Sequence, residues 1–249
     1  MNRLIRTELL KQRTLRTTRI GVAAAPAIAG LVTVAVYQAA GRDGNDPLSN
    51  SSLVQAIGAP ASIITVIALL LGVLAMTGEY RHQTITTTFL STPRRRDVVL
   101  AKLGAQLLTG ALIGVASVLM SVAVALPWLR AKGIPTDLDN RTLSVAAGVI
   151  ASAALYGTLG VSVGALIRNQ TAAFAAVLVW LLAIEGAIGQ LFHDKEFVRW
   201  LPVAAARDVV DAGTTSGSLP ASWAALVFCL YVALFAAAAT CFTIQRDVS

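Results

Sequence analysis

The sequence predicts an all-α integral membrane protein that forms one transmembrane domain over residues 1–249. Of the 249 residues, 56% are hydrophobic and only 13% are Asp, Glu, Lys or Arg, whereas an ordinary soluble domain has roughly 25% charged residues. The mean hydropathy is +0.70. Because so few charges cannot cover a surface that faces water, lipid is the solvent that suits this chain.

Six apolar stretches are long enough to form transmembrane helices, each of which takes about 20 predominantly apolar residues. One acidic residue, Glu185, interrupts the fifth stretch. The first stretch is longer than the apolar region of a cleaved signal peptide, roughly 7–15 residues, and we expect it to be a retained helix. The expected spans are residues 21–40, 54–76, 103–126, 143–167, 171–191 and 223–243.

The basic residues between these spans predict their orientation. The side that holds the N-terminal segment, the loop 78–102, Arg168 and the C-terminal tail carries 13 Lys and Arg residues, and the other side carries seven. Loops rich in Lys and Arg stay on the cytoplasmic side of a membrane. We therefore expect both termini in the cytoplasm.

The basic N-terminal segment, residues 1–20, is predicted to form an interfacial helix on the cytoplasmic membrane face. Its basic residues include Arg3, Arg6, Lys11 and Arg13. Anionic headgroups would attract each of them by about 1 kcal/mol near the surface. The same residues also act as a topology signal, and the pattern is compatible with both roles.

The loop 78–102 is the longest predicted cytoplasmic connection, with charges at both ends and a Thr-rich middle. Such a loop can dock a soluble partner, but its residues alone favour a solvated connection whose arginines fix the topology. His82 has no second His or Cys within ligand spacing, which argues against a metal site. The residues of interest are Glu79, Tyr80, Arg81, His82, Arg94 and Arg95.

Glu185 is the one acidic residue inside a predicted span. An ionisable group at membrane depth is costly, so a functional role is the first hypothesis. A buried carboxylate there could contact a cationic substrate or carry protons, as in an ion-coupled secondary transporter. The other interpretation is that the fifth helix is shorter and Glu185 lies at the outer interface.

Small residues recur at helical spacing in the third and fourth predicted spans. Such faces let two helices approach closely. We expect them to pack within the chain, with a dimer seam as the second interpretation. They are Gly110, Gly114, Ser117 and Ser121 in the third span, and Gly157, Gly160 and Gly164 in the fourth.

The sequence contains no recognisable catalytic machinery. It has no G-x-x-x-x-G-K-[ST] nucleotide-binding loop and no H-E-x-x-H motif. We therefore expect no enzymatic activity and no cofactor or metal in this chain, so that pumping would need energy from a partner or from an ion gradient. The net charge of +7 comes from Lys and Arg in short stretches between apolar runs. This pattern is typical of membrane topology and not of a nucleic-acid interface.

Several motifs together resemble the permease subunits of bacterial type-2 ABC exporters, and the resemblance covers nearly the whole chain. The N-terminal segment contains Glu8-Leu-Leu-Lys-Gln-Arg-Thr before the first span. The loop between the second and third spans reads Gly78-Glu79-Tyr80-Arg81-His82-Gln83-Thr84-Ile85, followed by Pro93-Arg94-Arg95 and Ala101-Lys102.

The resemblance implies an ATP-driven exporter of the bacterial plasma membrane. A separate ATPase subunit would bind ATP and Mg²⁺ and dock on the N-terminal helix and the loop 78–102, with Glu79 near the coupling element. A second permease chain, identical or a sibling, would complete the pathway. Short helices would lie at the outer leaflet between the fifth and sixth spans, within residues 192–211. The cargo is not implied.

Overall fold

The computed structural model describes residues 1–40, 51–81, 95–134, 136, 138–192, 196–211 and 218–245. Within these ranges all regular secondary structure is helical, as the sequence predicts. The α-helices are α1 (Asn2–Thr14), α2 (Arg16–Ala39), α3 (Ser52–Gly58), α4 (Ala61–Arg81), α6 (Arg95–Ala131), α7 (Asn140–Ile167), α8 (Gln170–Val179), α9 (Glu185–Leu191), α10 (Pro202–Val210) and α11 (Ala221–Gln245). A π-helix, η1 (Trp180–Ile184), joins α8 to α9, and a 3₁₀ helix, η2 (Glu196–Trp200), precedes α10.

Six segments of the described chain are long and apolar enough to cross a membrane, which confirms the six predicted spans. They are α2, α3 with α4, α6, α7, the run α8–η1–α9, and α11. Some boundaries differ from the prediction. The N-terminal helix α1 ends at Thr14, and α2 begins at Arg16 after an extended Leu15. The helix α6 has 37 residues, about 55 Å at 1.5 Å per residue, and is much longer than the expected 103–126.

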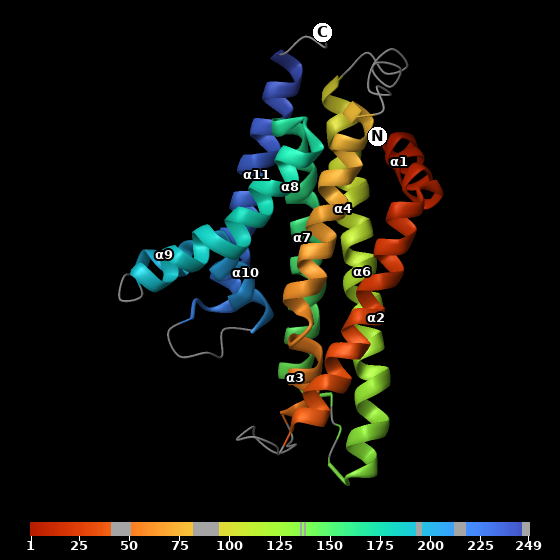
Figure 1. Cartoon of the computed structure of the whole chain (residues 1–249), viewed down its shortest axis with the longest axis vertical. Coiled ribbons are helices and arrows are strands. Elements are labelled where there is room, and N and C mark those ends of the chain that lie inside the picture. The colour runs from red at the N-terminus through yellow and green to blue at the C-terminus, as the bar shows by residue number, and fades with distance from the viewer. Residues whose placement is uncertain are drawn as a thin grey trace.

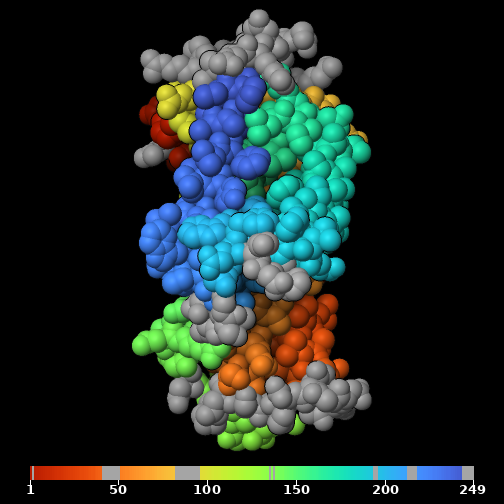
Figure 2. All heavy atoms as spheres, turned by 90° about the vertical axis from the view of Figure 1, so that its left-hand side faces the viewer, coloured from red at the N-terminus to blue at the C-terminus, as the bar shows by residue number. Residues whose placement is uncertain are grey.

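Figure 1 shows that the two ends of the bundle are different. The N-terminus, α1 and the C-terminal ends of α4 and α11 lie at one end, and α3 lies at the other. Helices α9 and α10 lie about halfway along the long axis, beside the bundle. In Figure 2, α11 and the run α8–η1–α9 cover the upper part of this face, and α2, α3 and the end of α6 form the lower part.

Spans five and six therefore connect partway along the bundle. The connection contains η2 and α10, so short helices lie within residues 192–211. The leaflet in which they lie stays a prediction, as does the cytoplasmic location of the termini.

The fifth span bends at the π-helix η1. A π-helical turn interrupts the regular i→i−4 ladder and is a common cause of kinks. After η1, α9 runs away from α7 instead of continuing alongside it (Figure 1). The bend places Glu185, the first residue of α9, at the start of the diverging segment.

Helix α7 is the centre of the bundle, where it packs against α4, α6 and α11. Glycines make its contact with α4 close. A Cβ atom on Gly160 would lie 2.1 Å from the carbonyl oxygen of Leu69, and one on Gly72 would lie 2.0 Å from that of Gly157. The small residues of the fourth span therefore serve packing within the chain, as predicted.

We expect Gly160→Ala to destabilise the protein by about 1–3 kcal/mol, the usual cost of overpacking. The new methyl group would overlap the Leu69 carbonyl, and two backbones would have to move apart. Thermal unfolding in mild detergent measures the effect. Gly189→Ala is the control, because no atom lies within 4 Å of its added Cβ. Equal melting temperatures for the two variants would contradict the close contact.

Candidate functional site

Four charged side chains from three helices meet at the end of the bundle where α1 lies. The Lys102 ammonium on α6 is 2.8 Å from Glu8 Oε2 on α1 and 2.7 Å from Glu79 Oε1 on α4. The Lys11 ammonium is 2.9 Å from Glu8 Oε1 and 3.1 Å from Glu79 Oε1. We call Glu8, Lys11, Glu79 and Lys102 the charge cluster. Of its four ion pairs, Lys102–Glu8 connects α1 to α6, Lys11–Glu79 connects α1 to α4, Lys102–Glu79 connects α6 to α4, and Lys11–Glu8 lies within α1.

Burial makes each ion pair in the charge cluster depend on the others. Lys102 is 2% exposed and Glu8 is 7% exposed. An unpaired charge in such a place costs several kcal/mol. Two carboxylates and two ammonium groups cancel, so the cluster is neutral as a whole. Detaching α1 would remove Glu8 and Lys11 from the cluster and leave the buried Lys102 paired with Glu79 alone.

A layer of amide and hydroxyl groups continues the same contact one turn further along α1. The Gln12 amide donates to Gln106 Oε1 at 3.1 Å, and the Thr109 hydroxyl donates to Gln12 Oε1. The Gln106 amide in turn donates to the Ala68 carbonyl on α4 at 3.4 Å. Helix α1 is thus bound to the bundle through a polar face that includes Glu8 and Gln12.

The basic residues of α1 divide between two roles. Lys11 belongs to the charge cluster, whereas Arg3, Arg6 and Arg13 are exposed. The exposed arginines leave a basic outer face on a helix whose inner face is fixed by ion pairs. A lipid surface or a protein with an acidic surface could bind this face.

The pKa values of Glu8 and Lys11 reflect these ion pairs. Burial alone would raise the pKa of the Glu8 carboxyl, but the ammonium groups of Lys102 and Lys11 outweigh it and hold the pKa below 4.5. Burial would lower the pKa of Lys11, but the carboxylates of Glu8 and Glu79 hold it above 10.5. Both groups are therefore charged at neutral pH.

We expect α1 to stay bound across neutral pH and to be released by acid. A lowered carboxyl pKa adds stability above about pH 4.5, which is lost as the pH falls through the folded-state value. The raised Lys11 pKa adds stability that is lost only as the pH rises past 10.5. Hydrogen exchange of the α1 amides, corrected for intrinsic rates, should show protection at pH 7 that falls progressively as the pH drops below 4.5. Protection that persists in α7 controls for global unfolding. Protection of α1 that does not fall before that of α7 would contradict the prediction.

The residues expected at the 78–102 loop point in two directions. Glu79 faces α1 and α6 through the charge cluster. Tyr80 and Arg81 face the turn between α7 and α8: the Arg168 guanidinium lies 5.4 Å from the Tyr80 ring centroid, and Arg81 donates to Gln170 Oε1 at 3.2 Å. Arg95 is the first residue of α6. His82 and Arg94 lie outside the described residues.

Glu185 holds the beginning of α10. Its Oε1 accepts hydrogen bonds from the backbone N–H groups of Val203 at 2.8 Å and Ala204 at 2.9 Å. Its Oε2 accepts from the Trp180 indole at 3.1 Å. The side chain is 6% exposed. Glu185 therefore supplies acceptors to helix-terminal N–H groups that have no partner within α10, and it ties the bent fifth span to the connection that follows.

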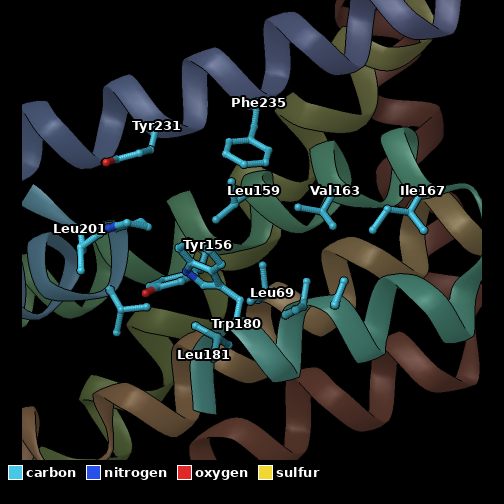
Figure 3. Close-up of a pocket in the computed structure, with 14 residues that line it drawn as sticks. Leu69, Tyr156, Leu159, Val163, Ile167, Trp180, Leu181, Leu201, Tyr231 and Phe235 are labelled. Carbon is cyan, nitrogen blue, oxygen red and sulfur yellow. The ribbon is translucent and has the colours of Figure 1, made fainter. Parts of the chain in front are cut away.

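An apolar cavity of about 430 Å³ lies beside the hydrogen bonds of Glu185, between α7, α8, η1, α10 and α11 (Figure 3). Trp180 contributes its ring to the cavity wall and its N–H to Glu185. Pro202 and Val203 at the start of α10 line the same cavity. The hydrogen bonds of Glu185 therefore fix one wall of the cavity.

Comparison with known proteins identifies the family. A family model described as ABC-2 family transporter protein matches residues 15–247, and no curated protein matches the chain. The matched region begins at Leu15, just before α2, and contains all six spans, while Glu8 and Lys11 of the charge cluster precede it. The chain is therefore a multi-pass membrane protein that belongs to the ABC-2 family of transporter permeases.

Proposed function

We propose that this chain is the membrane-spanning subunit of an ATP-driven exporter. In this proposal it works in a dimer of permease chains, identical or siblings, with a separate ATPase subunit that holds ATP and Mg²⁺. The observation that carries the proposal is the charge cluster, which fixes a basic surface helix to the transmembrane bundle of a transporter-family chain.

The energy source is inferred from the sequence and the family. The chain lacks the G-x-x-x-x-G-K-[ST] loop that cradles nucleotide phosphates. A permease of this family without that loop needs a partner that hydrolyses ATP. Among the described residues we also find no group of three or more His, Cys, Asp or Glu that could hold a metal ion.

The charge cluster could transmit a movement of an ATPase partner to the transmembrane helices. Helix α1 exposes Arg3, Arg6 and Arg13 outward while Glu8 and Lys11 bind inward. A partner that pushed on the outer face would move α4 and α6 with α1, because sliding α1 alone would break buried ion pairs. The end of α4, with Tyr80 and Arg81, would extend the contact surface toward the α7–α8 turn.

The proposed orientation places α1 and both termini in the cytoplasm of a bacterial cell. It follows from the excess of Lys and Arg at this end of the spans. The short helices η2 and α10 would then lie toward the outer leaflet. An ATPase that meets ATP in the cytoplasm would reach α1 directly.

Co-purification tests the proposal. We expect the C-terminally tagged chain, isolated in mild detergent, to bring along a soluble ATPase identified by mass spectrometry. Glu79→Lys should abolish this co-purification and transport without preventing membrane insertion, because a third cation beside Lys102 and Lys11 would expel α1. Arg130→Glu, an exposed charge reversal at the far end of α6, is the matched control. A chain that purifies without any nucleotide-binding protein would overturn the proposal.

A further inference from the structure

A groove lies between α1, α2 and α6 at the end of the bundle where the chain begins. Helix α1 packs against both α2 and α6, and α2 packs against α6, so the three helices form the walls of the groove (Figure 1). Its lining contains two arginines, Arg13 and Arg19, together with several apolar side chains. The groove therefore combines charge and apolar surface in one place.

The two arginines are free to bind an anion. Arg13 lies in the last turn of α1 and Arg19 in the first turn of α2, and both are exposed. Arg19 donates to the Thr14 carbonyl at 3.3 Å, which holds its guanidinium at the break between the two helices. Among the described residues neither arginine forms an ion pair, because all four ion pairs belong to the charge cluster. A guanidinium has five N–H donors and its planar fork matches phosphate oxygens, so both arginines keep donors for a phosphate group.

The rest of the groove is apolar and continues along the outside of α6. Ala23 on α2 and Leu108 and Leu112 on α6 line the groove, and the two leucines are 52% and 57% exposed. Val115 and Leu119 are also exposed, and their spacing places them on the same side of α6 as the two leucines. From Leu108 to Leu119 this apolar face is about 16 Å long at 1.5 Å per residue, close to half of a hydrocarbon core of about 30 Å. One acyl chain could lie along it.

The charged and apolar parts follow each other in the order that a bilayer requires. Arg13 and Arg19 come just before the uncharged stretch that begins at Ile20, whereas Leu108 and Leu112 lie inside the uncharged stretch of the third span. The arginines are therefore at the level of the headgroups and the leucines at the level of the hydrocarbon. The cavity beside Glu185 has the opposite order, because its tyrosine hydroxyl groups lie near α10, about halfway along the bundle (Figure 3).

An anionic phospholipid fits both parts of the groove. A free phosphate ion would meet the arginines but would leave Leu108 and Leu112 uncovered. An acidic protein surface could reach the arginines but not the apolar wall inside the hydrocarbon layer. The cationic group of a zwitterionic headgroup would be repelled by two guanidinium groups. A lipid with a net negative headgroup meets neither difficulty.

We propose that the groove between α1, α2 and α6 binds one anionic phospholipid, with its phosphate between Arg13 and Arg19 and one acyl chain along Leu108 and Leu112. The site differs from a general attraction between a basic helix and an anionic membrane, in which all the arginines of α1 would take part equally. It rests on the groove and not on the proposed export function, because lipid binding can be measured in the purified chain without an ATPase.

Native mass spectrometry of the full chain in mild detergent tests the site, because no anionic membrane surface is then present. The probe is phosphatidylglycerol, and phosphatidylcholine with the same acyl chains is the neutral comparison. We expect the wild-type chain to bind its first phosphatidylglycerol more tightly than phosphatidylcholine. Each basic residue beside an anionic headgroup is worth about fivefold in affinity. Combining Arg13→Gln with Arg19→Gln should therefore weaken the binding of phosphatidylglycerol roughly 25-fold.

Combining Arg3→Gln with Arg6→Gln is the matched control. It removes two exposed arginines from α1 that do not line the groove, and it should keep the wild-type Kd. Ala23→Trp should weaken binding without a change of charge by filling the apolar part, whereas Ala35→Trp, at an exposed position of α2 away from the groove, should not.

Three results would overturn the proposal. The first is an equal loss of affinity in the two pairs of arginine variants, which would indicate a general attraction. The second is equal affinity for the two lipids. The third is displacement of phosphatidylglycerol by inorganic phosphate at the same concentration, which would indicate a site for a free anion.

Discussion

Lys102→Met is expected to lower the free energy of unfolding by about 3–5 kcal/mol, the usual effect of removing one partner from a buried ion pair. Glu8 and Glu79 would then face each other with only the half-exposed Lys11 to balance two carboxylates. Methionine keeps the length of the side chain, so the loss reports charge and not a cavity. Thermal unfolding in mild detergent measures it, and hydrogen exchange should show that α1 is the first element to detach.

Two further variants make this prediction specific. Lys132→Met removes an exposed lysine just after the other end of α6 and should leave the melting temperature unchanged. Combining Lys102→Met with Glu79→Gln removes one of the repelling charges, and we expect it to recover part of the lost stability. A Lys102→Met protein that melts like the wild type would show that the cluster does not hold α1.

Glu185→Leu is expected to free the start of α10 and to distort the neighbouring cavity. It leaves the N–H groups of Val203 and Ala204 and the Trp180 indole without their acceptor. Each buried donor without a partner costs about 1–3 kcal/mol. Hydrogen exchange at Val203 and Ala204 should rise sharply, and transport should fall with it.

Glu185→Gln distinguishes a structural role of Glu185, as a hydrogen-bond acceptor for α10, from a role in ion-coupled transport. The amide oxygen of Gln can still accept both backbone N–H groups, and only the bond from the Trp180 indole is lost. We therefore expect most of the transport and most of the α10 protection to remain. An ion-coupled secondary transporter that used Glu185 would instead lose transport in the Gln variant as completely as in the Leu variant, and would respond to the proton gradient without ATP.

The six spans could be predicted because lipid imposes a strong local requirement on each of them. The ends of the spans could not be predicted from the sequence, and the region around Lys102 is an example. Counting from the nearest charge places the third span at 103, yet α6 extends back to Arg95. Within α6, Lys102 is buried and paired with Glu8 and Glu79, which are 94 and 23 residues away. Local sequence patterns do not contain such pairings.

The candidate site could be predicted only in part, because the sequence shows its acidic residues but not their distant partners. Glu79 and Glu185 stand out as acids at or inside apolar runs, but their partners depend on the tertiary fold. Pairing an acid near one span end with a lysine near another would have suggested Lys102 as a partner for Glu79. No local signal points to the bond from the start of α10 to Glu185, because it requires the bend at η1.

The central claim is that this permease is driven by a separate ATPase, and the most direct test is the ATP hydrolysis rate of that ATPase. The partner would be assayed alone, with the wild-type chain in nanodiscs, and with the Lys102→Met chain. We predict that the wild-type chain changes the rate several-fold and that the Lys102→Met chain, with α1 detached, does not. A rate that is the same with and without the wild-type chain would contradict the ATP-driven mechanism.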